Sequence, residues 1–182
     1  MHIRCLAASE LDAFLRYLNE HLLGNGRDGA PLFQPMPRGQ GFPPEKGAAF
    51  RNGAAAALGQ PGWRRVWVAE SDSGIMGHID LRSRPEPGTA HRALLGMGVQ
   101  REVRRAGVGM ALLDAAIAWA TEQGLEWIDL EVLSANAPAV ALYRKRGFVQ
   151  TGEIPDMFRI DGESLAYTYM SLALLAAPRQ PV

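Results

Sequence analysis

Residues 94–133 constrain the fold more than any other part of the sequence, because a strand, a helix and a second strand follow one another there. The apolar run 94–99 is typical of a buried strand. The run 108–123 carries apolar residues at helical spacing and stops before Gly124, a residue that commonly ends helices. The run 125–133 is again strand-like. Two strands joined through a helix pair in parallel with a right-handed crossover, so this stretch predicts the middle of a sheet.

The loop between that strand and that helix carries the pattern Arg-x-x-Gly-x-Gly over residues 104–109. Amides in the first turn of a helix have no partner within the helix and attract anions. We expect Gly107 and Gly109 to let a phosphate approach the backbone, with Arg104 and Arg105 as charged donors. The dinucleotide-fold pattern Gly-x-Gly-x-x-Gly and the pattern Gly-x-x-x-x-Gly-Lys-Ser/Thr are both absent from this loop. The loop therefore predicts a phosphate or pyrophosphate site of another kind.

The remaining elements predict an α+β fold, with a mixed central sheet of about seven strands flanked by helices. Turn-forming residues at 71–74, 85–88 and 160–163 separate strand-like runs and predict antiparallel neighbours. Ser9 and Asn136 are candidate caps for the first and last helices. The expected strands are 2–6, 65–70, 75–81, 94–99, 125–133, 148–152 and 164–175, and the expected helices are 9–23, 44–58, 108–123 and 136–146.

The segment 24–62 differs from the rest in composition, since it holds nine of the 20 glycines and six of the 12 prolines. Two interpretations stay open. The segment is either a flexible surface excursion or a lid on the substrate side, because long irregular segments in compact domains often carry function. We expect residues 1–182 to form a single domain, with 176–182 as a C-terminal tail.

Composition narrows the function classes. Lysine plus arginine and aspartate plus glutamate are 19 each, so we expect no nucleic-acid partner. No apolar run approaches the roughly 18 residues of a membrane span, and no signal peptide is visible, so we expect no membrane partner and a cytoplasmic location. Cys5 is the only cysteine and the four histidines are scattered, which predicts neither an intrachain disulfide nor a metal site.

A second motif lies downstream of the loop and strengthens its interpretation. Residues 136–148 read Asn-x-x-Ala-x-x-Leu-Tyr-x-x-x-Gly-Phe. Together with the loop and the element order, this motif resembles the GNAT superfamily of acyl-CoA-dependent N-acetyltransferases. The resemblance covers roughly residues 63–175, whereas 24–62 match no family motif. It implies acetyl-CoA as co-substrate, a primary-amine acceptor and no metal; members are often homodimers, which leaves a homodimer open here.

The resemblance also implies roles for individual residues. The strand residues 97–99 would pair with the pantetheine amides, the loop would hold the pyrophosphate, and Tyr143 would be the general acid beside the sulfur. Gly96 and Gly98 fit close approach by another backbone, although a simple bulge would explain them equally well. Tyr143 could instead be an ordinary packing residue. The implied cofactor-binding residues are Met97, Gly98, Val99, Arg104, Arg105, Ala106, Gly107, Val108, Gly109, Met110, Asn136, Ala139 and Tyr143.

The general base is open on sequence alone. Some family members carry a glutamate on the strand that precedes the loop, but 94–100 contain no acidic residue. Glu131 and Asp80 are the base candidates, ahead of His78, and an ordered water would serve equally well. We expect an N-acetyltransferase that works by direct attack of the amine, on a small-molecule amine, an amino acid or a protein N-terminus. The alternative is a non-catalytic acyl-CoA-binding regulatory module of the same fold.

Overall fold

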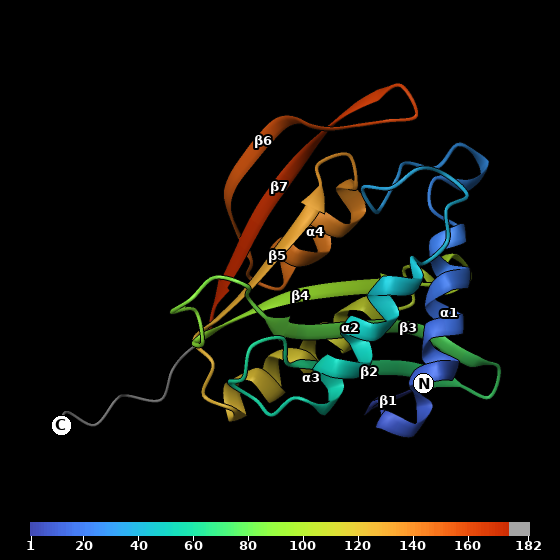
Figure 1. Cartoon of the computed structure of the whole chain (residues 1–182). Helices are drawn as coiled ribbons and strands as arrows, with labels where there is room; N and C mark the ends of the chain where they lie inside the picture. The colour runs from blue at the N-terminus through green and yellow to red at the C-terminus, as the bar shows by residue number, and fades with distance from the viewer. Residues whose placement is uncertain (175–182) are drawn as a thin grey trace.

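The computed structural model describes residues 1–174 as one seven-stranded mixed sheet with helices on both faces (Figure 1). The element order confirms the α+β prediction. The strands are β1 (His2–Cys5), β2 (Arg64–Ser71), β3 (Gly74–Ser83), β4 (Arg92–Val99), β5 (Trp127–Leu133), β6 (Val149–Ile160) and β7 (Glu163–Ala173). The helices are α1 (Leu11–Leu23), α2 (Pro44–Ala55), α3 (Val108–Glu122) and α4 (Ala137–Lys145). Leu175, where the last strand was expected to end, and the tail 176–182 lie outside the described residues.

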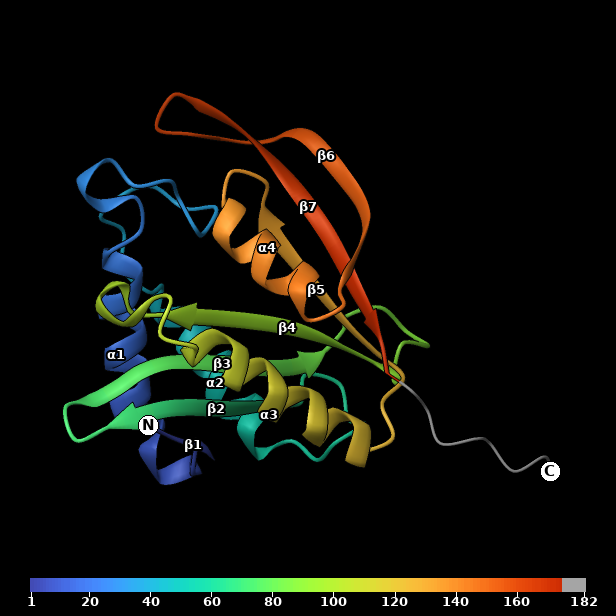
Figure 2. The same cartoon turned by 180° about the vertical axis from the view of Figure 1, so that it is seen from behind.

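The sheet runs in the order β1-β2-β3-β4-β5-β7-β6, and its centre is the predicted parallel pair. The strands β4 and β5, joined through α3, pair in parallel from Arg92–Trp127 to Leu95–Leu130. Beyond this last pair the two strands diverge, and β5, β7 and β6 fan away from β4 (Figures 1 and 2). The sheet is therefore closed at one end of its central pair and open at the other. We call the open part the split.

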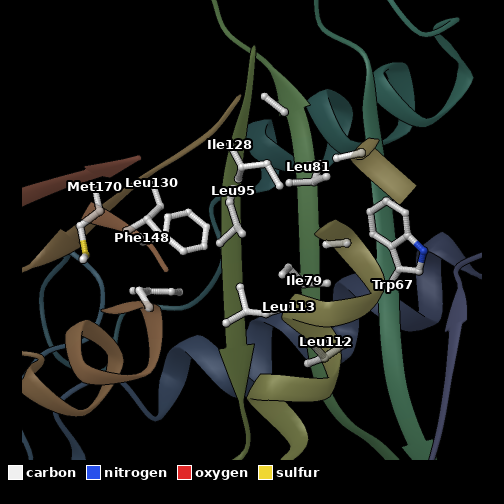
Figure 3. Close-up of a cluster of buried hydrophobic side chains, with 14 of the residues drawn as sticks. Trp67, Ile79, Leu81, Leu95, Leu112, Leu113, Ile128, Leu130, Phe148 and Met170 are labelled. Atoms are coloured by element: carbon white, nitrogen blue, oxygen red, sulfur yellow. The ribbon is translucent and has the colours of Figure 1, made fainter. Parts of the chain in front are cut away.

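The helices form two layers, with α1 and α2 over one face of the sheet and α3 and α4 over the other (Figures 1 and 2). Alternation along each strand sends successive side chains to opposite faces. On the α3 side the main core forms, including Ile79, Leu81, Leu95, Leu112, Leu113, Ile128 and Leu130 (Figure 3). On the α1 side a smaller cluster packs Phe14, Leu18, Phe50 and Val68. The larger core packs on β2, β3 and β4, and the smaller one packs on β2 and the start of β3.

Several element ends differ from the sequence prediction. Ser9 does not cap a helix; it lies in a short 3-10 turn, Ala8–Glu10, where the Glu10 carboxylate accepts a hydrogen bond from the Ala7 amide at 3.0 Å. The helix α2 ends at Ala55, before the expected Leu58. The Arg65 guanidinium donates to the carbonyls of Gly53 (3.3 Å) and Ala56 (2.9 Å) and so satisfies the end of this helix.

The last hairpin is longer than predicted, because β6 continues to Ile160. Pro155 and Asp156 interrupt strand patterns in sequence, but here they lie in an irregularity of the β6–β7 register between Ile154 and Phe158. In the opposite direction, β5 begins at Trp127, two residues later than expected, since Leu125 and Glu126 still belong to the turn after α3.

The connection from α1 to α2, residues 24–43, packs across the molecule. The side chain of Asn25, 1% exposed, accepts from the amides of Phe33 (2.8 Å) and Gln34 (3.1 Å) and donates to the carbonyls of Gln34 and Met36. Leu32 packs on Leu133 and Leu165 of the diverging strands. The Arg38 guanidinium reaches Asp161 (3.2 Å) and Glu163 (2.6 Å) at the β6–β7 turn. We call residues 24–43 the strap, because they tie α1 to the far side of the split.

In the part of the chain that the structure describes, no helix combines the length and the apolar character that crossing a membrane requires.

Candidate functional site

The first component of the site is an uncovered strand edge. Pairing between β4 and β5 stops at Leu95–Leu130, whereas pairing between β4 and β3 continues to Val99–Gly77. Residues Met97, Gly98 and Val99 therefore have a strand neighbour on one side only. The backbone groups on the other side can pair with an extended ligand, as an added strand would. The structure thus has the uncovered strand edge that the predicted pairing of residues 97–99 with the pantetheine amides requires.

The glycines of this edge have a structural cause. The β3–β4 register is continuous from Ser83–Ala93 to Gly77–Val99, so the bulge that was an alternative for Gly96 and Gly98 is absent. A Cβ on Gly98 would lie 2.5 Å from Nε2 of His21 and 2.6 Å from Cε1 of His78. Two imidazoles, one from α1 and one from β3, thus lie directly over the edge.

The second component is the start of α3. The short turn Arg101–Val103 leads into Arg105, with φ 66°, and Gly107, with φ 84°, which is the residue before the helix. The first hydrogen bond of α3 is donated by Ala111 to the Gly107 carbonyl at 3.1 Å. Nothing among residues 1–174 accepts from the amides of Val108, Gly109 and Met110. These amides form the uncovered helix N-terminus that the loop pattern predicts.

The two glycines of the loop have different roles. No atom lies within 4 Å of a Cβ placed on Gly107, so this residue is required by its left-handed backbone and borders open space. A Cβ on Gly109 would lie 2.9 Å from Cδ2 of Leu142 on α4. The contact adds a packing reason for glycine at 109, next to the side chain of a neighbouring helix. The role expected of Gly109 at a phosphate stays a prediction.

Positive charge without a carboxylate partner accompanies these amides. Arg104 and Arg105 are both exposed, as is Ala106. Arg104 donates to the Val99 carbonyl at 3.3 Å, and its guanidinium lies 5.9 Å from the centre of the Phe33 ring in the strap. Neither arginine forms an ion pair with any carboxylate of the described chain. Cations at a helix N-terminus are unfavourable unless an anion joins them, so this arrangement suits a bound phosphate.

The third component is Tyr143 on α4. Its side chain is 6% exposed and packs on Phe148, with ring centres 5.7 Å apart. The hydroxyl makes no hydrogen bond with residues 1–174, and burial, together with the neighbouring Tyr167, raises the Tyr143 pKa well above its usual value. The phenol therefore stays protonated at neutral pH and has its donor free. Ala139 lies one turn earlier on the same face of α4.

Asn136 precedes α4 but does not cap it as predicted. Its backbone carbonyl accepts from the amides of Ala139 (3.0 Å) and Val140 (3.1 Å), whereas its side chain makes no capping hydrogen bond. Backbone acceptance satisfies the first turn, so the half-exposed carboxamide is left available for a ligand.

The base candidates differ in how they are held. Asp80 is 4% exposed and pairs with Arg82 at 3.0 Å and Arg64 at 3.6 Å. His78 is bonded to the Tyr17 hydroxyl at 3.2 Å through Nδ1, and burial together with His21 lowers its pKa to about 3. Glu131 is exposed and pairs with no cation among the described residues. Of these side chains, Glu131 alone is a carboxylate free to accept a proton.

His21 is a site residue that sequence reasoning missed. It extends the apolar stripe of α1 through Phe14 and Tyr17, and its ring lies 4.9 Å from that of Phe33. Burial, with a further contribution from Arg104, lowers its pKa to about 4. In the sequence, the one indication of His21 was that a polar residue occupies a position of the apolar stripe of α1.

A surface hollow of about 590 Å³ also lies between α1 and α2, lined by Asp12, Leu15, Asn19, Phe42 and Arg51 among others. None of its lining residues belongs to the uncovered edge, the α3 start or α4.

Comparison with known proteins decides the family. Residues 33–148 match the model of the Acetyltransferase (GNAT) family. The chain belongs to this family. The GNAT resemblance of the two motifs is thereby confirmed.

Curated relatives extend this result. The L-methionine sulfoximine/L-methionine sulfone acetyltransferase of Pseudomonas paraeruginosa is 36% identical over 123 residues, which are 66% of this chain and 69% of that protein. Human N-acetyltransferase 8 is 30% identical over 89 residues, 48% of this chain. The mycothiol acetyltransferase of Propionibacterium freudenreichii is 33% identical over 108 residues, 58% of this chain. The matched regions span only 39% and 35% of the lengths of the last two proteins.

Solved GNAT structures share the fold over nearly the whole chain. The protein yncA from Salmonella typhimurium, solved with its cofactor acetyl-CoA, superposes with a TM-score of 0.76 at 20% identity and covers 98% of this chain and 96% of its own. A ribosomal-protein-alanine N-acetyltransferase from Brucella melitensis gives a TM-score of 0.74 at 24% identity, covering 96% of this chain and 100% of its own.

Proposed function

We propose that this GNAT protein is an acetyl-CoA-dependent N-acetyltransferase that transfers the acetyl group to a primary amine by direct attack. The proposal rests on the fact that two uncovered parts of the backbone follow one another along the chain. The uncovered β4 edge at Met97–Val99 leads through one short turn into the free amides at the start of α3. An extended pantetheine arm and a pyrophosphate are joined in this order within coenzyme A.

The residues present fit that group. Backbone groups of Met97, Gly98 and Val99 would pair with the pantetheine amides. The loop residues Arg104, Arg105, Ala106 and Gly107, with the amides of Val108, Gly109 and Met110, would hold the pyrophosphate. The free carboxamide of Asn136 and the face of α4 at Ala139 and Tyr143 would border the arm near its thioester.

The chemistry assigned to the chain is proton handling and positioning. Acetyl-CoA, when bound, supplies an acyl carbon activated as a thioester. Glu131 takes a proton from the substrate ammonium, so that the amine can form the N–C bond as the C–S bond breaks. Tyr143 gives its proton to the departing sulfur, which leaves as a thiol because the pKa of a thiol is about 8.5. The second proton leaves the new amide nitrogen and restores the Tyr143 phenol through solvent.

Asp80 is less suited to the base role than Glu131. Two arginines already neutralise Asp80, and proton transfer to it would leave both partly buried cations without this partner. A water bound by Glu131 remains compatible with the same path. The alternative function, an acyl-CoA-binding module without catalysis, needs only the edge and the loop. The free donor of Tyr143 and the free carboxylate of Glu131 favour the enzyme.

Calorimetric titration with acetyl-CoA tests the proposal. We compare the wild type with Gly107→Trp, which fills the space next to the loop amides. The matched control is Gly124→Trp: Gly124 also has a left-handed backbone (φ 73°) and open space, but at the other end of α3. We expect micromolar binding by wild type and control, and at least a 100-fold loss for Gly107→Trp. Absence of wild-type binding would overturn the proposal.

A further inference from the structure

Two side chains flank the point where the sheet splits, on the side of α1. The last β4–β5 pair is Leu95–Leu130, so Gly96 and Glu131 are the first residues of β4 and β5 that no longer pair with the other strand. Gly96 has no side chain, and the space above it is taken by the Asp80–Arg82 pair of β3. A Cβ on Gly96 would lie 2.6 Å from Oδ1 of Asp80 and 3.1 Å from Nη1 of Arg82. Arg82 therefore lies at the border of the split formed by β3 and β4, and Glu131 lies at the opposite border, formed by β5.

Both side chains face the same way. Leu130 packs into the core under α3, so its neighbour Glu131 points to the opposite face. Gly98, two residues after Gly96, borders His21 of α1, which places this row of β4 on the α1 side as well. Tyr167 of β7, paired with Leu133, also lies on this face.

The Tyr167 hydroxyl lies within electrostatic range of both charges. Burial raises the pKa of Tyr167 to about 12; the Glu131 carboxylate and Tyr169 act in the same direction, and the Arg82 guanidinium acts against them. Tyr167 in turn raises the pKa of Tyr143, the proposed general acid. The strand register, with Gly96 and Glu131 directly after the last β4–β5 pair, places the two charges where the split begins.

The two charges are not compensated. Asp80 is shared by Arg82 and Arg64, which leaves this cluster with one excess positive charge. The Nε and Nη2 groups of Arg82 donate to no acceptor in residues 1–174, and the side chain is 30% exposed. Glu131 has no cation partner in that range, and no ion pair joins it to Arg82.

Asp129 gives the contrast. It lies two residues before Glu131 on the same face, and it accepts from Arg84 (3.1 Å), Arg92 (2.8 Å) and Ser171 (2.6 Å). The sheet therefore neutralises the carboxylate next to the split but leaves Glu131 and one edge of Arg82 open.

We propose that the acceptor is a free α-amino acid, held by its carboxylate on Arg82 and by its ammonium at Glu131. This inference rests on the proposed function and adds the substrate class. A guanidinium edge binds a carboxylate through two parallel hydrogen bonds, which a lysine cannot do. A peptide N-terminus or a polyamine has the ammonium but lacks the α-carboxylate, so either would leave Arg82 unused.

Thiol release with acetyl-CoA tests the substrate class. Each of the 20 common L-amino acids is assayed beside its carboxamide, and the best pair is repeated with Arg82→Gln. Arg84→Gln is the matched control, because Arg84 lies two residues further along the chain, just past the end of β3, and is engaged by Glu86 and Asp129. We expect the wild type to prefer the acid by about 10- to 100-fold in kcat/KM, the effect of a lost charged hydrogen bond. The preference should fall below threefold in Arg82→Gln and persist in Arg84→Gln.

The outcomes separate cleanly. Acetylation of carboxamides, peptides or diamines as efficiently as the free acids would overturn the amino-acid class while leaving the acetyltransferase intact. A full acid preference in Arg82→Gln would overturn the role of Arg82. If Arg82→Gln does not fold, Arg82→Lys replaces it, with the acid preference expected to fall at least threefold. No acetyl-CoA binding, or no turnover of any amine, would instead refute the proposed function itself.

Discussion

The two sides of the split are built from different parts of the chain. On the α3 side, the proposed ligand contacts come mostly from main-chain groups of one continuous stretch, Met97–Met110. On the α1 side, they come from side chains of separate elements, Arg82 of β3 and Glu131 of β5. A main-chain site depends on the backbone conformation and on the positions where only a glycine fits. A side-chain site depends on which charges the fold leaves unpaired. The two sides should therefore respond to different substitutions.

The largest effect is expected where the two sides meet. Tyr143→Phe removes the free donor but keeps the ring that packs on Phe148. We expect kcat to fall by about 10²- to 10⁴-fold, the usual value of a general acid, with acetyl-CoA affinity within threefold of wild type. Steady-state kinetics and calorimetry measure the two quantities separately. Equal losses in binding and kcat would show that Tyr143 only packs.

The α1 side should be sensitive to acid. The pKa values of His21, about 4, and His78, about 3, lie below the ordinary 6.5, so the unfolded chain binds more protons than the folded one below pH 6.5. Stability is therefore present above pH 6.5 and is lost as the pH falls toward 4. His21→Phe, next to Phe33 and Tyr17, should reduce the slope of unfolding free energy by about 1.4 kcal/mol per pH unit. Urea denaturation at pH 4.5 to 6.5 measures this; an unchanged slope would contradict the assignment.

On the α3 side, the two loop glycines should separate. Gly109→Ala places a Cβ 2.9 Å from Cδ2 of Leu142, and we expect a loss of about 1 to 3 kcal/mol. Leu142→Ala should cost stability by itself but should relieve this clash in the double variant. Gly107→Ala has no such neighbour, so Leu142→Ala should not rescue it. Thermal unfolding of the three single variants and the two double variants decides; rescue of Gly107→Ala by Leu142→Ala would remove the distinction between the two glycines.

The smallest effect concerns the strap. Arg38 is a solvent-screened link to Asp161 and Glu163, so Arg38→Gln should leave the stability almost unchanged. If the strap helps to shape the acceptor side, KM for the acceptor should rise two- to threefold while affinity for acetyl-CoA stays constant. A change in acetyl-CoA affinity without a change in the acceptor KM would show that the strap does not shape the acceptor side.

This difference also explains what could be predicted from the sequence. The edge, the loop and α4 follow from patterns within a few residues of one another, and the parallel pair follows from the strand–helix–strand order. The choice among Asp80, His78 and Glu131 does not, because it depends on partners brought by the fold. Arg84 and Asp129, for example, are 45 residues apart. The role of Gly109 escaped for the same reason: its contact, Leu142, belongs to another helix.

The place of β7 has a consequence for how the protein is made. This strand is the last one described along the chain, yet it lies between β5 and β6 inside the sheet. During synthesis, β5 has no partner on that side until residues 163–173 leave the ribosome. The nascent chain therefore exposes the bare edge of β5, with its apolar residues, to neighbouring chains from the time residues 127–133 emerge until residues 163–173 follow. A stalled or shortened chain that ends before residue 163 should aggregate through this edge.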